Sequence, residues 1–270
     1  YGVATIATER EKMKQIKVSI SSLGCYEQCP RKYKYQYLDK LPRRSFEHLD
    51  VGNYVHEVLE YFHSEINVLQ APFKKEDLLK KIAKERWSGY STKISQEGLI
   101  KSRDLLKSYL QYIDRTFMPD VLATEDEFMF NITDNIIMRG IVDRIDRMPD
   151  GSLRILDYKT GKSKNLHKFQ IQVYGIHLKN KYPETENYTG TFLVLPEGPK
   201  EVNYALKTSE LQPIADSIAA QATSIMEDQT WDPKPTRLCD YCDFNNHCPD
   251  AYGKSKQNSD LVTIGKRITF

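Results

Sequence analysis

Two aspartates and a lysine flank a sharp turn in the middle of the chain. A Pro-Asp-Gly segment at 149–151 separates two apolar runs, which is typical of a β-hairpin turn. With the turn centred there, antiparallel partners carry numbers that sum to about 300, so Asp143 and Asp157 should face each other. Lys159 points to the same face as Asp157, because side chains alternate along a strand. Two facing carboxylates repel each other unless a cation lies between them, and oxygen ligands suit Mg2+ or Mn2+. The spacing therefore predicts a divalent-metal site with an ammonium group beside it.

The alternative is that both aspartates are surface charges paired with Arg144, Arg147 or Lys159. The neighbouring residues argue against surface charges, because the strand around Asp157 carries Ile, Leu and Tyr on both of its faces. A carboxylate buried in such a strand needs a partner charge or a metal to offset its lost hydration. We therefore favour a metal site over surface ion pairs.

The five cysteines form two groups near opposite ends of the chain. Cys239, Cys242 and Cys248 have the spacing C-x2-C-x5-C, while Cys25 and Cys29 lie some 210 residues upstream. Three closely spaced thiols with a distant fourth are typical of a four-thiolate metal centre, which on spacing alone would hold zinc or an iron–sulfur cluster. We expect no disulfides, since the cytoplasmic location predicted below is reducing.

Two strings around the hairpin resemble a known family. GIVDRID at 140–146 and LDYKTGK at 156–162, followed by Gln170 and Tyr174 as Q-x-x-x-Y, closely resemble the PD-(D/E)XK nuclease superfamily. The most similar branch is the RecB and AddB type of exonuclease, and CRISPR adaptation nucleases are also similar. The resemblance covers about residues 18–250. It implies an α/β fold with a restriction-endonuclease-like core, in which a central mixed β-sheet is flanked by helices after an N-terminal helical region.

The resemblance also implies roles for the residues of the hairpin and the helix after it. Asp143, Asp157 and Lys159 would form the catalytic D…D-x-K set. Gln170 and Tyr174 would lie on the helix after the hairpin, where they shape the site and its DNA contacts. Ordinary helix packing remains the alternative for Tyr174.

A histidine upstream of the hairpin matches the same branch. His56, within GNYVHEVLEYF at 52–62, looks like the histidine motif that supplies a metal ligand in addition to the two aspartates. The main-chain carbonyl of Tyr158 completes the expected ligand set. Because imidazole suits Mn2+ better than Mg2+, we expect manganese to support activity at least as well as magnesium. Glu60 and Glu127 are weaker candidates for supporting roles.

For the cysteines, the resemblance favours iron over zinc. RecB-like and CRISPR adaptation nucleases with this arrangement carry a 4Fe-4S cluster on one N-terminal cysteine followed by proline and on a C-terminal trio. Cys29 fits the N-terminal position, which implies Cys29, Cys239, Cys242 and Cys248 as cluster ligands. Cys25 is then a spare thiol, and zinc is the less favoured occupant. The implied role of the cluster is structural.

The elements that must position these residues follow from the apolar periodicity and the prolines. Helices are expected over 18–41 (interrupted at Pro30), 52–69, 76–88, 96–117, 164–180 and 209–227, and strands within 125–159 (three antiparallel), 189–195 and 201–206. The predicted domains are a leader or tail at 1–17, a single nuclease domain at 18–250 and a C-terminal tail at 251–270. Within the nuclease domain we expect a helical region at about 18–120, a catalytic core at about 123–228 and a cysteine-bearing segment at about 229–250.

The composition indicates a soluble globular protein. Hydrophobic residues make up 40% and charged residues 28% of the chain, and the mean hydropathy is −0.59. No stretch approaches the roughly 18 apolar residues of a membrane span. We therefore expect a cytoplasmic protein with no membrane partner.

Basic and aromatic residues are concentrated near the N-terminus. Although the net charge is only +2, residues 30–44 hold six basic residues against one acid, with Tyr33, Tyr35 and Tyr37 interleaved. This pattern suits single-stranded nucleic acid, because basic groups neutralise phosphates and aromatic rings stack on bases. The alternative is that Tyr33 and Tyr37, four residues apart, simply pack on the buried side of a helix.

Together these features predict a metal-dependent DNA exonuclease that hydrolyses phosphodiester bonds in DNA repair, recombination, or phage or CRISPR DNA processing. The expected partners are DNA with a free end or single-stranded DNA, and a helicase or recombination protein. Two alternatives remain: a non-catalytic DNA-binding or scaffolding subunit with a nuclease fold, and a restriction-like endonuclease.

Overall fold

The computed structural model describes residues 15–44, 46–66, 74–116, 120–161, 166–196 and 198–253. Contacts divide the chain into two compact units, one formed by residues 1–44 with 218–270 and the other by residues 45–217. Most of the leader or tail expected at 1–17 and of the tail expected at 251–270 lies outside the described residues.

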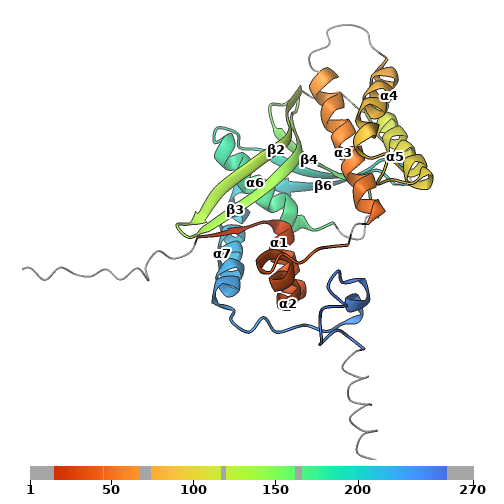
Figure 1. Cartoon of the computed structure of the whole chain (residues 1–270). Helices are drawn as coiled ribbons and strands as arrows, with labels where there is room; N and C mark the ends of the chain where they lie inside the picture. The colour runs from red at the N-terminus through yellow and green to blue at the C-terminus, as the bar shows by residue number, and fades with distance from the viewer. Residues whose placement is uncertain are drawn as a thin grey trace, which may run out of the picture. The chain divides into compact units, whose positions relative to one another are not determined.

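The order of the elements confirms the expected helical first half and mixed second half (Figure 1). The elements are β1 (Ile16–Val18), α1 (Ile20–Gln28), α2 (Pro30–Tyr33), the π-helical turn η2 (Lys34–Leu38), α3 (Glu47–Ile66), α4 (Lys75–Arg86), η3 (Trp87–Gly89), α5 (Gln96–Arg115), β2 (Asp120–Thr133), β3 (Ile136–Arg147), β4 (Leu153–Lys159), α6 (Lys168–Lys181), β5 (Tyr188–Val194), β6 (Lys200–Leu206), η5 (Thr208–Glu210), α7 (Leu211–Glu227) and η6 (Arg237–Tyr241). The short strand β1 was not predicted, and the predicted boundaries differ from these by a few residues.

The sheet of the unit at 45–217 is mixed. Strands β2 and β3 are antiparallel, as are β3 and β4, whereas β4 and β5 are parallel and β5 and β6 are again antiparallel. The parallel pair requires a crossover, and α6 supplies it between β4 and β5. A mixed sheet flanked by helices confirms the predicted α/β, restriction-endonuclease-like class.

Helices cover both faces of this sheet. On one face α3, α4 and α5, which lie together in Figure 1, share a hydrophobic core with Leu156, Tyr158 and Leu193 of the strands. On the other face α6 approaches β5 so closely that a Cβ atom on Gly190 would lie 1.9 Å from Cγ2 of Ile171. Glycine at 190 therefore sets how near α6 and its polar side chains come to the sheet.

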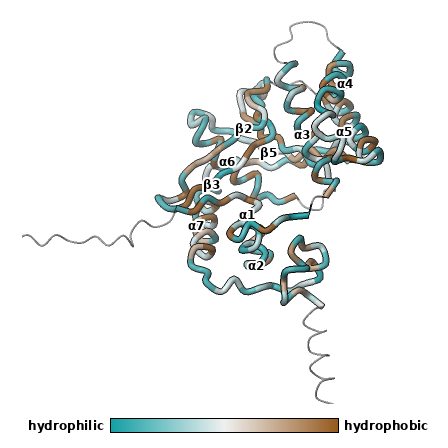
Figure 2. The backbone as a smooth tube through the Cα atoms, viewed as in Figure 1, coloured by the Kyte–Doolittle hydropathy of each residue, from teal (hydrophilic) through white to brown (hydrophobic). Residues whose placement is uncertain are grey.

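Helix α5 shows why these segments are helical. The side chain of Ser95 accepts a hydrogen bond from the Gly98 N–H and so caps the first turn. Leu105, Tyr109 and Tyr112 recur at four- and three-residue steps and are buried. In Figure 2 the tube of α5 alternates between hydrophobic and hydrophilic colours, as expected of an amphipathic helix. No helix among the described residues is both long and apolar enough to cross a membrane.

The other unit contains the basic segment. Helix α1 begins with a capping box at Ser19, and Pro30 is the first residue of α2. Tyr33 is only 4% exposed and its ring stacks on Trp231, with the centroids 5.9 Å apart and the planes at 5°. The packing alternative is therefore correct for Tyr33. The ring of Tyr37, which is half-buried, lies against Tyr33 at 4.9 Å.

Candidate active site

The hairpin between β3 and β4 has the predicted register. Arg144 pairs with Leu156, so partner numbers sum to 300 and Asp143 lies at the level of Asp157. The paired register ends at Arg144 and Leu156. Beyond it, the Tyr158 N–H donates a 2.7 Å hydrogen bond to Oδ2 of Asp143. At this point a side chain of β3 therefore takes the place of a backbone acceptor.

One imidazole and two carboxylates meet at this end of the hairpin. Ligand atoms of His56, Glu125 and Asp143 lie within 4.8 Å of one another. Nδ1 of His56 is 3.4 Å from Oδ2 of Asp143 and 4.0 Å from Oε1 of Glu125. One nitrogen and two hard oxygen donors fit a divalent cation such as Mn2+ or Mg2+. The structure thus brings together His56 and Asp143, which the sequence placed in one site.

Burial and mutual charge interactions raise the pKa values of three side chains in this site. Burial opposes a charge on His56, but Asp143, with help from Asp157 and Glu125, outweighs it and raises the pKa of His56 to about 9. Burial, and then Asp143, raise the pKa of Glu125 to about 7. Burial and Asp143 likewise raise the pKa of Asp157 to about 7, although Lys159 opposes this. Protons therefore compete for the same ligand atoms that a divalent cation would use.

Glu125 is the site residue that the sequence analysis missed. It lies between Thr124, which pairs with Arg144, and Asp126, which pairs with Val142. Its φ of +44° is in the left-handed region, which is rare for a residue with a side chain, and Glu125 is skipped in the pairing of β2 with β3. This distorted backbone accompanies a carboxylate that lies beside His56. By contrast, Glu127, two residues further along the strand, is exposed.

The amide of Gln170 connects the remaining predicted residues. Its Oε1 accepts a 3.0 Å hydrogen bond from Nζ of Lys159. Its Nε2 donates to Oδ1 of Asp157 and to the hydroxyl of Tyr174, both at 2.8 Å. Nζ of Lys159 lies 2.6 Å from Oδ2 of Asp157. Asp157, Lys159, Gln170 and Tyr174 thus form one hydrogen-bonded set. Asp157, which was expected as a metal ligand, is not part of the group formed by His56, Glu125 and Asp143.

A cavity of about 860 Å³ opens at the ligand groups. His56 and Glu125 line it, and so does Glu60, the other weaker candidate of the sequence analysis. Gly52 and Thr160 also line it, and a Cβ atom on Gly52 would lie 3.1 Å from Oγ1 of Thr160. The absence of a side chain at Gly52 therefore lets α3 pass close to the end of β4 and brings His56 to the hairpin.

The cysteines gather in the unit that holds residues 1–44 and 218–270. Cys29, Cys239, Cys242 and Cys248 line one cavity of about 40 Å³. All five cysteines are free thiols. Cys25 is buried with 8% exposure, is not among the described residues that line this cavity, and has a pKa raised to about 11 by burial. The four predicted ligands thus line one cavity, and Cys25 lies one helical turn before Cys29, whose N–H donates a 3.0 Å hydrogen bond to the Cys25 carbonyl.

Comparison with known proteins finds similar sequences in DNA-processing enzymes. A subunit of the ATP-dependent helicase/deoxyribonuclease of Streptococcus agalactiae serotype Ia is 28% identical over 172 residues, which is 59% of this chain and 15% of that protein. The corresponding subunit from Streptococcus uberis is 30% identical over 154 residues, 55% of this chain and 14% of that protein. The chain therefore spans only about 15% of the length of these relatives. The gene 69 protein of Mycobacterium phage D29 is 25% identical over 280 residues, which is 88% of this chain and 99% of the phage protein.

Structural comparison agrees with the fold. A crystal structure from Eubacterium rectale, described as a candidate exonuclease, matches 89% of this chain and 91% of its own with a TM-score of 0.51 and 12% identity. The model of the PD-(D/E)XK nuclease superfamily matches residues 17–249, which include the hairpin, the upstream histidine and all five cysteines. The chain belongs to the PD-(D/E)XK nuclease superfamily.

Proposed function

We propose that this chain is a divalent-metal-dependent deoxyribonuclease that hydrolyses phosphodiester bonds from a DNA end. The observation that carries the proposal is the meeting of His56, Glu125 and Asp143 within 4.8 Å, beside the ion pair of Asp157 and Lys159. His56, Glu125 and Asp143, with the carboxylate of Asp157 and the carbonyl of Tyr158, would hold Mn2+ or Mg2+. When bound, the cation lowers the pKa of a coordinated water and neutralises charge on the scissile phosphate.

The other residues of the site act on the phosphate and on the attacking water. Lys159 would orient the water and stabilise the negative charge that develops on the phosphate. Gln170 holds both Lys159 and Asp157, so it fixes the direction of the ammonium group. Tyr174 accepts the second hydrogen bond of the Gln170 amide and so orients that amide.

DNA is the substrate that the relatives favour. The streptococcal relatives are deoxyribonuclease subunits, and the enzyme to which they belong is an ATP-dependent helicase. A role in repair, recombination, or phage or CRISPR DNA processing, with a helicase or recombination protein as partner, is therefore part of the proposal. We also propose that residues 18–250 form one nuclease domain and that the protein is cytoplasmic, where thiols stay reduced.

The test is digestion of matched linear and closed circular DNA by the purified chain with Mn2+. An exonuclease is expected to degrade only the linear molecule, and labels at the 5′ and 3′ ends then report its direction. Cleavage of the circle would instead identify a restriction-like endonuclease. Loss of neither molecule would leave a DNA-binding or scaffolding subunit and contradict the proposal.

We also propose a 4Fe-4S cluster on Cys29, Cys239, Cys242 and Cys248. Four sulfur donors around one cavity support it, and four thiolates are the usual ligands of such a cluster. The bound cluster would tie the segment around Cys29 to that around residues 239–248. It would have no part in hydrolysis.

The cluster predicts a specific pattern of iron binding. Chain purified without oxygen is expected to be brown, to contain iron and acid-labile sulfide, and to lose both in Cys242→Ser. Cys25→Ser is the matched control, since Cys25 is not among the described residues that line the cavity, and it should keep its iron. Iron retained in Cys242→Ser, or zinc in its place in the wild-type chain, would contradict an iron–sulfur cluster.

A further inference from the structure

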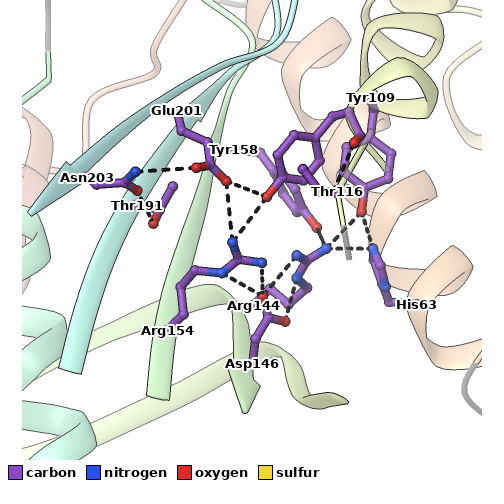
Figure 3. Close-up of polar contacts among 11 residues, drawn as sticks. His63, Tyr109, Thr116, Arg144, Asp146, Arg154, Tyr158, Thr191, Glu201 and Asn203 are labelled. Atoms are coloured by element: carbon purple, nitrogen blue, oxygen red, sulfur yellow. Dashed lines mark hydrogen bonds and ion pairs between the residues drawn. The ribbon is translucent and has the colours of Figure 1, made fainter. Parts of the chain in front are cut away.

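A cluster of buried charges lies between the helices and the sheet of the unit at 45–217 (Figure 3). At its centre are Arg144 and Asp146 of β3, whose side chains are 1% and 0% exposed. Nε of Arg144 lies 2.8 Å from Oδ1 of Asp146, and Nη2 donates to Oδ2 at 3.0 Å. The guanidinium therefore has a fixed orientation, because one edge of it is held by the carboxylate.

The other end of the guanidinium faces helices α3 and α5 and strand β4. Nη1 of Arg144 lies 2.7 Å from Nε2 of His63, 2.8 Å from the hydroxyl of Tyr109 and 3.0 Å from that of Tyr158. Burial and the neighbouring guanidinium hold the pKa of His63 well below its usual range. His63 is therefore neutral, and its Nε2 is the acceptor for Arg144.

Two neighbouring residues of β3 thus hold two histidines of the same helix. Asp143 contacts Nδ1 of His56 at 3.4 Å, and Arg144 donates to His63 at 2.7 Å. The histidines are seven residues apart, which is two turns of α3, so both lie on the side that faces β3. Two contacts that lie two turns apart restrain the helix both against sliding along the strand and against rotation.

Tyr158 connects the same cluster to the ligand groups. Its hydroxyl meets Arg144, and its backbone N–H holds Asp143 at 2.7 Å. Its ring lies edge-on to His56, with centroids 5.8 Å apart and planes at 89°. Through Tyr158 the cluster therefore also restrains Asp143 and the ring of His56.

We propose that His63 and Arg144 are positioning residues, whose hydrogen bond fixes α3 on β3 and thereby sets the separation of His56 and Asp143. The proposal rests on the proposed metal site. A shift of α3 by one residue would move His56 by about 1.5 Å along the helix axis. Metal–ligand distances tolerate only about 0.2 Å.

The test is the affinity of the chain for Mn2+, measured by calorimetric titration, alongside thermal unfolding. His63→Leu removes the acceptor that α3 offers to Arg144, together with the contact of His63 with the Tyr109 hydroxyl, and leaves Arg144 only the hydroxyls of Tyr109 and Tyr158 at this end. It is expected to weaken Mn2+ binding about 10- to 100-fold, the range typical of residues behind metal ligands. His63→Gln keeps an acceptor near the position of Nε2 and should restore most of the affinity.

Arg154→Met is the matched control. Arg154 holds the same Asp146, through Nε at 3.1 Å and Nη2 at 2.8 Å, but its other contacts are Tyr112 and Glu201. This variant should lower the unfolding temperature and keep the wild-type affinity for Mn2+. If His63→Leu does not fold, His63→Asn serves in its place, since its shorter polar side chain does not reach the position of Nε2 and should also weaken binding.

The outcomes separate this proposal from the one on which it rests. Wild-type affinity in His63→Leu, or in His63→Asn where that variant replaces it, overturns the positioning role. A loss of affinity in Arg154→Met as large as that in His63→Leu also overturns it, because general stability would then explain both. If the wild-type chain binds no Mn2+, or Asp143→Asn binds it unchanged, the proposed metal site itself fails and the positioning role with it.

Discussion

Lys159→Ala is expected to abolish DNA hydrolysis, with the rate of the chemical step lowered about 10²- to 10³-fold or more. Nζ of Lys159 lies 2.6 Å from Oδ2 of Asp157 and 3.0 Å from Oε1 of Gln170. Alanine removes the positive charge that would stabilise a developing phosphoryl anion. It also removes the ammonium group that lowers the pKa of Asp157, so the Asp157 carboxylate would be more protonated. The lost positive charge and the protonation of Asp157 both slow hydrolysis.

The measurement is single-turnover digestion of end-labelled linear DNA at saturating Mn2+, with the fold checked by circular dichroism. Asp157→Ala should give a loss of the same order, because it removes the acidic partner of Lys159 and Gln170. Lys168→Ala is the matched control on the surface of α6, where Lys168 is 46% exposed and pairs with Glu210. Hydrolysis retained in either site variant would remove that residue from the mechanism.

Mn2+ affinity is expected to rise steeply with pH, by at least about a hundredfold between pH 6 and pH 8. His56 has a pKa of about 9, so its ring is protonated across this range and must lose a proton before it can bind a metal. Each such proton contributes about a tenfold change per pH unit below the pKa. Glu125, with a pKa of about 7, adds to the slope at the acid end. Affinity therefore falls as the pH falls.

Calorimetric titration at several pH values, in buffers of different ionisation enthalpy, measures both the affinity and the number of protons released. His56→Asn should release about one proton fewer at pH 8 and show a shallower dependence on pH. A wild-type affinity that stays constant from pH 6 to pH 8 would mean that His56 and Glu125 are not ligands.

The hairpin could be predicted from the sequence because its determinants are local. The turn at 149–151 fixes which residues of β3 and β4 oppose each other, and the observed register agrees. Glu125 could not be found in the same way. A count across the turn at 134–135 pairs Asp126 with Asp143, but the register shifts by one residue between Asn131 and Thr133, so Asp126 pairs with Val142 and Glu125 lies at the level of Asp143.

The buried charge cluster could not be predicted from local patterns. Arg144 was considered only as a surface partner of the aspartates, whereas it is buried and pairs with Asp146. Its other partners, His63 and Tyr109, are 81 and 35 residues away in the chain. The periodicity of residues within one helix or strand cannot predict contacts between residues so far apart in the chain. The parallel pairing of β4 with β5 was likewise not evident from their residues, because α6 separates them in the chain.

Selection for heat resistance and selection for turnover should act differently on the buried pair of Arg144 and Asp146. Its charges have lost their hydration, and apolar side chains of similar volume often stabilise a protein as well or better at such positions. Laboratory evolution for heat resistance alone would therefore tend to replace the pair with hydrocarbon. Laboratory evolution for turnover would keep it. Sequences from the two selections should therefore differ first at these two positions of the core.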